Sequence, residues 1–522
     1  MTAPASGAYA PPPPLHGAAL LLGTLSLSLA TFMNVLDSSI ANVSIPAISG
    51  DMGVSPNQGT WVITSFGVAN AISVPLTGWL TQRFGAVRLF LSSVLLFVLT
   101  SWLCGFATSL EMLIVGRVLQ GLVAGPMIPL SQTLLLSSYP RAKAGTALAL
   151  WGVTTLVAPV VGPLLGGWIT DNVSWPWIFY INVPVGLLAA GITWSIYRHR
   201  ETPTQKKPID TVGLTLLVLW VGSLQLMLDK GKELDWFASN QIVGLAIVAA
   251  VAFAVFVVWE LTDDHPVVDL RLFGRRNFAF GVLALSVAYG LFFGNVVLMP
   301  LWLQQWMGYT ATNAGMALAP VGVLAILLTP VVGKMVSVWD PRRMATAAFV
   351  VFAIVLWMRA QFTTQTDFMH ILVPTLIQGG AMAFFFIPLT TLTLAGLTPE
   401  RIPAAAGLSN FVRITAGAMG TSIATTVWES RAALHHAHLT EPLVQGQGAF
   451  AATLDALKSA GLGAEQALAQ VNQLINQQAF TRAADDIFLA SGGLFLSLIA
   501  LIWLTRRPST MSGSAVDAGG AH

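Results

Sequence analysis

Charged side chains are scarce in this sequence. Only 9% of its 522 residues are Asp, Glu, Lys or Arg, whereas 55% are hydrophobic. A soluble protein of this length has no core large enough to hide so much apolar side chain, so the composition predicts a polytopic membrane protein. The net charge of +2 and the scatter of basic residues over loops give no support to nucleic-acid binding.

Cysteine is almost absent. The single Cys104 lies in an apolar segment, which excludes an internal disulfide framework and any multi-cysteine metal site. No Gly-x-x-x-x-Gly-Lys-Ser/Thr segment occurs, so direct energisation by ATP is not expected. No nucleophile–base pair or metal-ligand cluster is recognisable either. The sequence therefore predicts neither an enzyme nor a resident metal or cofactor.

Long apolar runs fill most of the chain. Runs bounded by charges, Gly/Pro clusters or tryptophan predict an all-α fold with fourteen membrane-spanning helices. Their expected limits are 18–41, 58–80, 87–107, 111–138, 144–168, 175–197, 210–228, 241–261, 277–304, 312–338, 343–361, 370–396, 404–428 and 486–505.

Two related halves are predicted from an internal repeat. The segment 119–121 (Leu-Gln-Gly) followed by 128–130 (Ile-Pro-Leu) recurs as 377–379 (Ile-Gln-Gly) followed by 387–389 (Ile-Pro-Leu). Parallel repeats of this kind are typical of rocking transporters with a substrate site at the interface of the halves. The expected divisions are a disordered tail without a signal peptide at 1–17, a six-helix half at 18–197, an inserted helix pair with flanking loops at 198–276, a second six-helix half at 277–505, a long outer hairpin within it at 429–485, and a tail at 506–522.

The distribution of basic residues predicts the orientation. With the N-terminus in the cytoplasm, 17 of the 25 Lys and Arg residues fall on inner loops and five on outer loops. Cytoplasmic loops of membrane proteins carry such an excess. Both termini are therefore expected in the cytoplasm.

The first predicted span contains a carboxylate. Inserting an ionisable group at the centre of a span costs at least ~2.5 kcal/mol, and such groups by default mark an ion or substrate path. At 100° per residue, Asn34 and Asp37 share one arc with other small or polar residues, so this helix has a wet or partner-facing side. We therefore expect Asp37 to gain and lose a proton.

Arg117 is the expected partner of Asp37. It lies six or seven residues into the fourth span and stays charged, so it needs a carboxylate, carbonyl groups or water. Gln120 lies on the same helical face. The pair, direct or through water, either couples transport to protons or statically holds the first and fourth spans together.

A family resemblance accompanies these residues. Segments 36–46 (LDSSIANVSIP), 113–121 (LIVGRVLQG) and 158–167 (APVVGPLLGG) resemble signatures of the fourteen-span drug:proton antiporters of the major facilitator superfamily, as does the loop 78–85 (GWLTQRFG). The match is closest to the EmrB-type multidrug export pumps. In the loop motif, Gly78, Arg83 and Gly85 correspond to the family pattern, but Gln82 stands where an acidic residue is usual.

This resemblance implies a protein of the bacterial inner membrane. It implies proton-driven export of hydrophobic drug-like compounds from the cytoplasm or the membrane, together with a periplasmic membrane-fusion adaptor and an outer-membrane channel. A different sense of transport, such as import or export of an endogenous lipid or metabolite, stays open. A non-transporting scaffold or receptor is disfavoured by the arginines and polar residues within spans.

The fifth predicted span is rich in small residues. Gly162 and Gly166 have the spacing that allows close helix approach, and prolines let a span bend. The set expected to serve helix packing and gating is Pro159, Gly162, Pro163, Gly166 and Gly167. Tight packing is one interpretation, and sealing of the cavity against the second half is the one that the resemblance implies.

A substrate cavity needs apolar walls and a few polar anchors. The residues expected to line it are Asn34, Gln120, Asn295, Gln378, Phe384, Phe385, Asn410 and Arg413. Because three consecutive residues cannot all face inward on a helix, at most two of the phenylalanines at 384–386 contribute. Arg413 lies ten residues into its span, and an intramembrane cation favours weakly acidic or anionic substrates.

The outer segment 429–485 is the longest predicted loop. It begins with three histidines, at 435, 436 and 438, for which a solvated surface is favoured over a metal site. Apolar residues at helical spacing follow on both sides of Gly461, which predicts an amphipathic hairpin. This hairpin either caps the outer mouth of the transporter or docks the adaptor that the resemblance implies.

Overall fold

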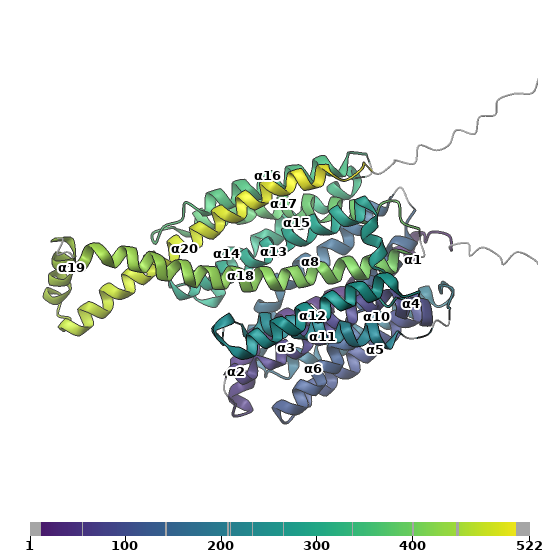
Figure 1. Cartoon of the computed structure of the whole chain (residues 1–522), viewed down its shortest axis with the longest axis horizontal. Coiled ribbons are helices and arrows are strands. Elements are labelled where there is room, and N and C mark those ends of the chain that lie inside the picture. The colour runs from purple at the N-terminus through teal and green to yellow at the C-terminus, as the bar shows by residue number, and fades with distance from the viewer. Residues whose placement is uncertain are drawn as a thin grey trace, which may run out of the picture.

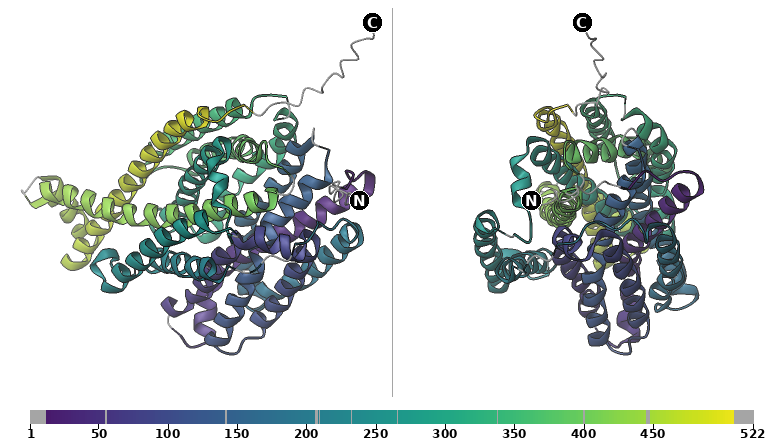
Figure 2. Two further views of the ribbon diagram at one scale, coloured as in Figure 1. Left: turned by 45° about the vertical axis from the view of Figure 1, so that its right-hand side comes forward. Right: turned by 90° about the vertical axis from the view of Figure 1, so that its right-hand side faces the viewer.

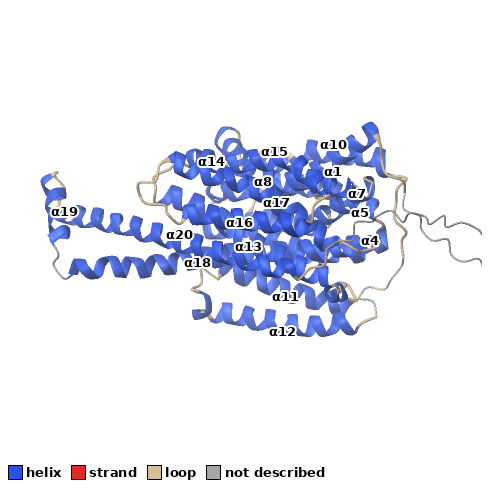
Figure 3. Ribbon diagram, turned by 90° about the horizontal axis from the view of Figure 1, so that it is seen from above, coloured by secondary structure: helices blue, strands red, loops and turns tan. Residues whose placement is uncertain are grey.

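The described part of the chain is entirely helical in its regular structure. The computed structural model describes residues 12–54, 56–140, 143–205, 208, 210–231, 233–264, 266–336, 338–398, 401–444 and 448–507. Figure 3 shows helices and loops and no strand among these residues. Most of the two predicted tails lies outside the described residues.

The first helices form the N-terminal bundle of Figure 1. They are α1 (Gly17–Asp51), α2 (Pro56–Gly59), α3 (Trp61–Ser73), η1 (Val74–Leu76), α4 (Thr77–Phe84), α5 (Ala86–Gly105), α6 (Leu110–Ala124), α7 (Met127–Ser138), α8 (Ala144–Asn172), α9 (Trp177–Tyr180) and α10 (Asn182–Tyr197). We call this set the first bundle. A separate pair follows, α11 (Thr211–Lys230) and α12 (Asn240–Thr262), with the short η3 (Trp236–Ala238) between its members.

The remaining helices form the second bundle. The short η4 (Leu270–Gly274) leads into it. Its members are α13 (Arg276–Gln305), α14 (Ala311–Leu318), α15 (Pro320–Met335), α16 (Pro341–Arg359), α17 (Phe368–Leu394), α18 (Ile402–Val444), α19 (Gly448–Ser459) and α20 (Ala464–Trp503).

Membrane-spanning character is widespread among these helices. Twelve stretches of the described chain are long and apolar enough to cross a membrane. Two further helices outside that set, α8 and α18, have 29 and 43 residues. A span needs about 20 residues. The structure therefore agrees with the predicted all-α polytopic membrane protein.

Several helices begin where the sequence supplies an N-terminal cap. Ser109 accepts a hydrogen bond from the backbone of Met112 at the start of α6. Asp210, Asp340 and Asp367 cap α11, α16 and α17 in the same way. Such a cap contributes about 1 kcal/mol, because it satisfies an N–H that has no partner within the helix.

Three helices are longer than their predicted spans. Helix α1 continues through Pro46 to Asp51, α18 extends to Val444, and α20 begins at Ala464 rather than near 486. Hydropathy marks where a helix leaves lipid, but a helix ends only where a breaker or an alternative backbone partner ends it. The segment 421–441 contains neither proline nor glycine, so α18 continues beyond its apolar part.

The same helix pairings occur in both bundles. In the first bundle, α1 packs against α8 and α10, α3 packs against α6, and α5 packs against α6 and α10. In the second bundle, α13 packs against α18 and α20, α15 against α17, and α16 against α17 and α20. The bundles meet where α8 contacts α14, α15 and α17, and where α18 contacts α7, η1 and α4. Helices α11 and α12 lie along one side, with α11 against α3 and α18 (Figure 3).

The long segment that was predicted as an outer hairpin forms a projecting helical arm. Helices α18 and α20 continue side by side beyond the other helices, and α19 lies at their far end (Figures 1 and 2). The Trp428 indole donates to the Phe480 carbonyl oxygen, and Asp486 contacts Arg431 and His435. These contacts tie the two helices together near the base of the arm. The start of α1 and the end of α20 lie at the opposite end of the molecule.

Candidate functional site

Asp37 lies at the centre of a buried polar cluster in the first bundle. Its side chain is fully buried, and its Oδ2 atom accepts a 2.6 Å hydrogen bond from the Arg117 guanidinium. Its Oδ1 atom accepts from Gln120 Nε2 at 3.2 Å and from Asn182 Nδ2 at 2.8 Å. The pairing expected from the sequence is therefore direct. The polar arc of α1 faces protein partners.

Five helices contribute to this cluster. Ser101 of α5 accepts hydrogen bonds from both Gln120 and Asn182, at 2.6 and 3.1 Å. Arg117 also donates to the Val62 carbonyl oxygen of α3 at 3.0 Å and lies 4.2 Å from the centre of the Phe66 ring. Because α1, α3, α5, α6 and α10 all hold one charge pair, a change of charge at its centre acts on all of them.

The cluster depends on a buried ion pair. A buried ion pair is stable only while both charges are present, and removing one partner typically costs about 3–5 kcal/mol. Loss of either charge would therefore weaken the attachment of α1 to Arg117 on α6.

Asn34, one turn before Asp37, joins α1 to the break between α6 and α7. Its Nδ2 atom donates to the Ala124 carbonyl oxygen at 3.1 Å, at the break between α6 and α7. Pro126 at this break lacks the N–H that would continue the helical ladder, which leaves carbonyl groups in need of donors. Asn34 and Gln120 were expected in the substrate cavity, but both are committed to contacts inside the first bundle.

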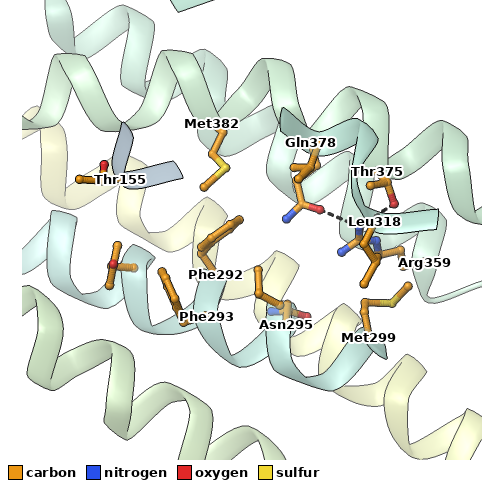
Figure 4. A pocket seen from close by; sticks show the side chains of 13 residues that line it. Thr155, Phe292, Phe293, Asn295, Met299, Leu318, Arg359, Thr375, Gln378 and Met382 are labelled. Atoms are coloured by element: carbon orange, nitrogen blue, oxygen red, sulfur yellow. Dashed lines mark hydrogen bonds between the residues drawn. The ribbon is translucent and has the colours of Figure 1, made fainter. Parts of the chain in front are cut away.

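The larger of two described cavities lies mainly in the second bundle, and Figure 4 shows it from close by. It has a volume of about 80 Å³. Its polar lining comes from Thr155 of α8, Asn295 of α13, Arg359 of α16, and Thr375 and Gln378 of α17. Its apolar lining is Tyr289, Phe292, Phe293, Val296, Met299, Leu318, Val321 and Met382. Of the residues expected to line a cavity, Asn295 and Gln378 are here.

Sequence reasoning missed Arg359 as a cavity residue. Its side chain is 2% exposed and donates to Gln378 Oε1 at 2.6 Å and to Thr375 Oγ1 at 3.2 Å. Arg359 lies near the end of its predicted span, where an arginine side chain usually reaches the membrane interface, and it was therefore not expected inside the protein. The internal repeat could have indicated it. In the first half, Arg117 lies three residues before the Gln-Gly motif, whereas the second half has Thr375 at the matching position. The glutamine of the second half therefore needs an arginine from another helix if the repeat extends to this contact.

Arg413 borders a second, smaller cavity. This cavity is lined by residues of both bundles, namely Gln132, Trp151, Leu285, Phe386, Thr390, Leu394, Ala406, Ser409, Asn410 and Arg413. The Arg413 guanidinium donates to Asn410 Oδ1 at 2.5 Å. It lies 4.7 Å from the ring centre of Tyr289 and 4.9 Å from that of Phe386. Asn410 Nδ2 also donates to Gln132 Oε1 at 3.2 Å, which joins α18 to α7.

The two described cavities do not include the phenylalanines that were expected to line the substrate cavity. Neither Phe384 nor Phe385 lines either described cavity, whereas Phe386 lines the second one. Phe385 points into the second bundle, where its ring packs against Phe349 and Phe352 of α16. Successive residues differ by about 100° around a helix, so the choice among the three depended on a rotation that the sequence does not fix.

The glycines of α8 pack against α1. A β-carbon at Gly162 would lie 2.6 Å from the Ser39 β-carbon, and one at Gly166 would lie 2.9 Å from the Ile40 carbonyl oxygen. Gly167 has ordinary contact with Val43 at 3.8 Å. The close contact of these glycines is thus within the first bundle, two to three residues from Asp37.

The rest of the small-residue stretch is less fully described. Leu164, between the two glycines, contacts Gly315 of α14 and so reaches the second bundle. Pro159 and Pro163 lie in α8, but their side chains lie outside the described residues.

The loop motif joins the two bundles at the end of the molecule where α1 begins. A β-carbon at Gly78 would lie 2.7 Å from the Ala404 β-carbon of α18. Gly85 has a φ of +89°, which favours glycine, and it precedes α5. Arg83 lies over the Trp79 ring at 5.8 Å.

Glu201, an acidic residue from a later loop, contacts the residues that directly follow this motif. The Glu201 carboxylate accepts hydrogen bonds from the backbone N–H groups of Val87 and Arg88 at 3.0 and 2.9 Å. It therefore caps the N-terminus of α5, close in space to a motif in which Gln82 replaces the usual acid.

No metal site is recognisable in the part of the chain that the structure describes, where no group of three or more His, Cys, Asp or Glu residues could hold an ion. His435 lies 2.8 Å from Asp486, and His436 lies 3.1 Å from Asn472. Both histidines thus link α18 to α20.

Comparison with known proteins places this architecture in a family. Residues 27–421 match the model of the Major Facilitator Superfamily. The chain is 52% identical to the multidrug export protein EmrB of Escherichia coli K12, over 98% of this chain and 99% of that protein. It is 49% identical to the fatty acid resistance protein FarB of Neisseria gonorrhoeae, over 96% of this chain and 99% of that protein.

A solved structure supports the fold. The human organic anion transporter MFSD10 (TETRAN) aligns with a TM-score of 0.61 at 12% identity, covering 93% of this chain and all of that one. At this identity the likeness concerns the fold alone. The chain belongs to the Major Facilitator Superfamily, and within it to the EmrB-type multidrug export transporters.

Proposed function

We propose that this protein is a proton-coupled exporter of hydrophobic drug-like compounds, with weak acids as a candidate class. The observation that carries the proposal is the fully buried Asp37–Arg117 pair at 2.6 Å, held by Gln120 and Asn182. An ionisable carboxylate in a span marks an ion path by default. The EmrB and FarB relatives support export and a hydrophobic substrate class.

The proposed cycle begins with protonation of Asp37 from the outer side. The neutral acid no longer pairs with Arg117, so α1 becomes free to shift relative to α6. Gly162 and Gly166 place α8 directly against α1, and α8 in turn contacts α14, α15 and α17. A shift of α1 is thereby passed to the second bundle, and loss of the proton on the inner side restores the pair.

The proposed topology has fourteen spans. Helices α8 and α18 are long enough to be the two spans beyond the twelve found by hydropathy. An even number of spans agrees with the start of α1 and the end of α20 lying at the same end of the molecule (Figure 2). The excess of basic residues on the predicted inner loops supports a cytoplasmic location for that end and a periplasmic location for the arm of α18, α19 and α20.

The arm is the proposed docking element for a partner. We propose that a periplasmic membrane-fusion adaptor binds it and, with an outer-membrane channel, completes a tripartite pump across the envelope from the inner membrane. The length of the arm supports this role, since α18 alone has 43 residues.

The test is drug efflux from everted membrane vesicles under an imposed pH gradient. The Asp37→Asn variant should lose gradient-driven transport, because an amide fills the same space but holds no exchangeable carboxyl proton. Ser38→Ala is the matched control, since the Ser38 hydroxyl donates only to the Asn34 carbonyl oxygen of its own helix. Unchanged gradient-driven efflux by Asp37→Asn, at equal protein level, would refute the proposal.

A further inference from the structure

Arg359 is a buried cation whose charge no described acid balances. It is 2% exposed, and its Nε atom has no hydrogen-bond partner. Its side-chain partners, Thr375 and Gln378, are both neutral. Among the described residues, no Asp or Glu forms an ion pair with it.

This arrangement differs from that of Arg117 and Arg413, the other two arginines that are buried in the described part of the chain. Arg117 has a carboxylate at 2.6 Å. Arg413 lies over the rings of Tyr289, Phe386 and Trp151, whose faces attract a cation. Within the described residues, Arg359 has neither kind of compensation. An isolated buried charge is costly and buried charges are as a rule paired, so a bound anion would supply the charge that Arg359 lacks.

The Arg359 guanidinium borders the cavity in the second bundle. Figure 4 shows it beside Gln378 and Thr375 at one end, with Met299 and Leu318 nearby. Phe292, Phe293 and Met382 line the space farther from it. The cavity thus has a cationic end and an apolar remainder, which fits a molecule with one anionic group on an aromatic or aliphatic body.

A second unpartnered polar atom borders the same space. Asn295 Nδ2 donates to the Leu291 carbonyl oxygen and to Ser491, but its Oδ1 atom is buried without a hydrogen-bond partner. It is available to accept a donor on the ligand. The volume of about 80 Å³ is small beside the ~300–1,000 Å³ of sites for drug-sized ligands, so in this conformation the cavity takes part of a ligand only.

We infer that Arg359, with Gln378 and Thr375, forms the subsite that binds the carboxylate of amphiphilic monoanions on their way through the transporter. The inference rests on the proposed function, because it treats the occupant as cargo. The apolar body of the ligand lies toward Phe292 and Met382. Arginine suits this task, since its planar donors match the two oxygens of a carboxylate.

The test is equilibrium binding to the purified full-length protein in lipid nanodiscs at pH 7.5, where no gradient exists. The probes are 1-naphthoate and its uncharged methyl ester, with binding to protein-free nanodiscs subtracted. The wild-type protein should prefer the anion by about tenfold or more, because a charge-assisted hydrogen bond is the stronger kind. Arg359→Gln should remove this preference, and Arg359→Lys should retain part of it.

Two further variants separate a binding role from a structural one. Asn295→Asp keeps the arginine and adds a carboxylate to the same cavity, so it should also lower naphthoate binding relative to the ester, even if Arg359→Gln does not fold. Arg413→Gln should retain the preference. Equal binding of the two probes by wild type, equal loss of both in Arg359→Gln, or loss of the preference only in Arg413→Gln would each overturn the inference.

This binding test is independent of the transport test. If Asp37→Asn keeps its gradient-driven efflux, proton coupling is wrong but the anion preference of the cavity is unaffected. If the preference is absent while Asp37→Asn abolishes efflux, the subsite is wrong and proton coupling stands.

Discussion

Gln120 and Gln378 lie at the same depth in two different helices, each ten residues beyond the first residue of its helix, α6 or α17. Each uses its side-chain oxygen to accept a short hydrogen bond from a buried arginine, at 2.7 Å from Arg117 and at 2.6 Å from Arg359. The two arginines reach this common position from different places, since Arg117 is on the same helix as its glutamine and Arg359 is on the neighbouring α16.

The two halves therefore repeat a geometry and differ in charge. The first bundle neutralises its arginine with Asp37, whereas the second places Asn295, a neutral amide, beside the cavity. We interpret the first as the proton site and the second as the ligand site. This division assigns the driving ion and the cargo to different halves.

The Asp37–Arg117 pair should show strong energetic coupling. Asp37→Asn and Arg117→Met should each destabilise the purified protein by about 3–5 kcal/mol, because each leaves one buried charge without its partner. The double variant should lose clearly less than the sum of the two. A double-mutant cycle of unfolding free energies in detergent measures this coupling, and additive losses would show that the two charges do not interact.

The contact between α8 and α1 should not tolerate a side chain at Gly166. Gly166→Val places carbon atoms against the backbone of Ile40, and overpacking of this kind costs about 1–3 kcal/mol. Gly244→Ala in α12 is the matched control, because nothing lies within 4 Å of its added carbon. Thermal unfolding of both variants should show a lowered midpoint for Gly166→Val only.

The contact between Gly78 and Ala404 should matter for transport more than for folding. Gly78→Leu forces α4 and α18 apart at the end of the molecule where α1 begins, and the nearest atoms that the added side chain meets belong to Ala404 of the other bundle. We expect the drug efflux rate to fall by about tenfold or more, which corresponds to about 1.4 kcal/mol in a barrier. Gly191→Leu, at a position with nothing within 4 Å, should transport normally.

Glu201 should stabilise the start of α5. Glu201→Ala removes the acceptor for the N–H groups of Val87 and Arg88, and loss of such a cap costs about 0.5–2 kcal/mol. Glu201→Gln keeps one acceptor oxygen and should lose less. The comparison is made by thermal unfolding in detergent, and an equal effect of the two variants would argue against capping.

Asp340 should give a pH-dependent contribution to stability. Partial burial acts to raise the pKa of its carboxyl, but hydrogen bonds from the Arg342 side chain and backbone, and the charge of Arg342, outweigh it and hold the pKa below its ordinary value. Because the folded-state pKa is lowered, the carboxylate stabilises the fold above the unfolded value of about 4, and this stabilisation is lost as the pH falls through the folded-state value.

The variant Asp340→Asn isolates this charge, since asparagine still caps a helix. The unfolding temperatures of wild type and variant should differ by a constant amount from pH 7 to pH 5 and converge below about pH 4. A difference that persists unchanged at pH 3 would contradict the assignment.

The sequence was sufficient for the Asp37–Arg117 pair because each charge stands in an apolar span and needs a partner. It was not sufficient for Asn182, which follows a tryptophan-rich loop and carries no charge, although its amide completes the cluster. Arg359 was missed for a related reason. The burial of its side chain depends on how α16 packs against α17. Hydropathy indicates only how far Arg359 lies from the end of the span.

For the fold, hydropathy was informative about helices within lipid and poor about their extent outside it. Residues 429–444 were expected to belong to a loop-borne hairpin, but they continue α18 without interruption. Hydropathy also did not determine which face of α17 points into the second bundle and which points toward the interface between the bundles. Phe384, Phe385 and Phe386 are chemically identical, and only the packing of α16 decides which of them turns away from the bundle interface.

The unbroken continuity of α18 also turns the arm into a lever. At 1.5 Å per residue, its 43 residues span roughly 65 Å from Ile402, close to the contact of Ala404 with Gly78, to Val444. A tilt of about 5° at the inner end then displaces the far tip by about 5 Å, through rigid geometry alone. If the proposed transport cycle tilts α18 by this amount, a partner bound at α19 would be displaced by the same distance in each cycle.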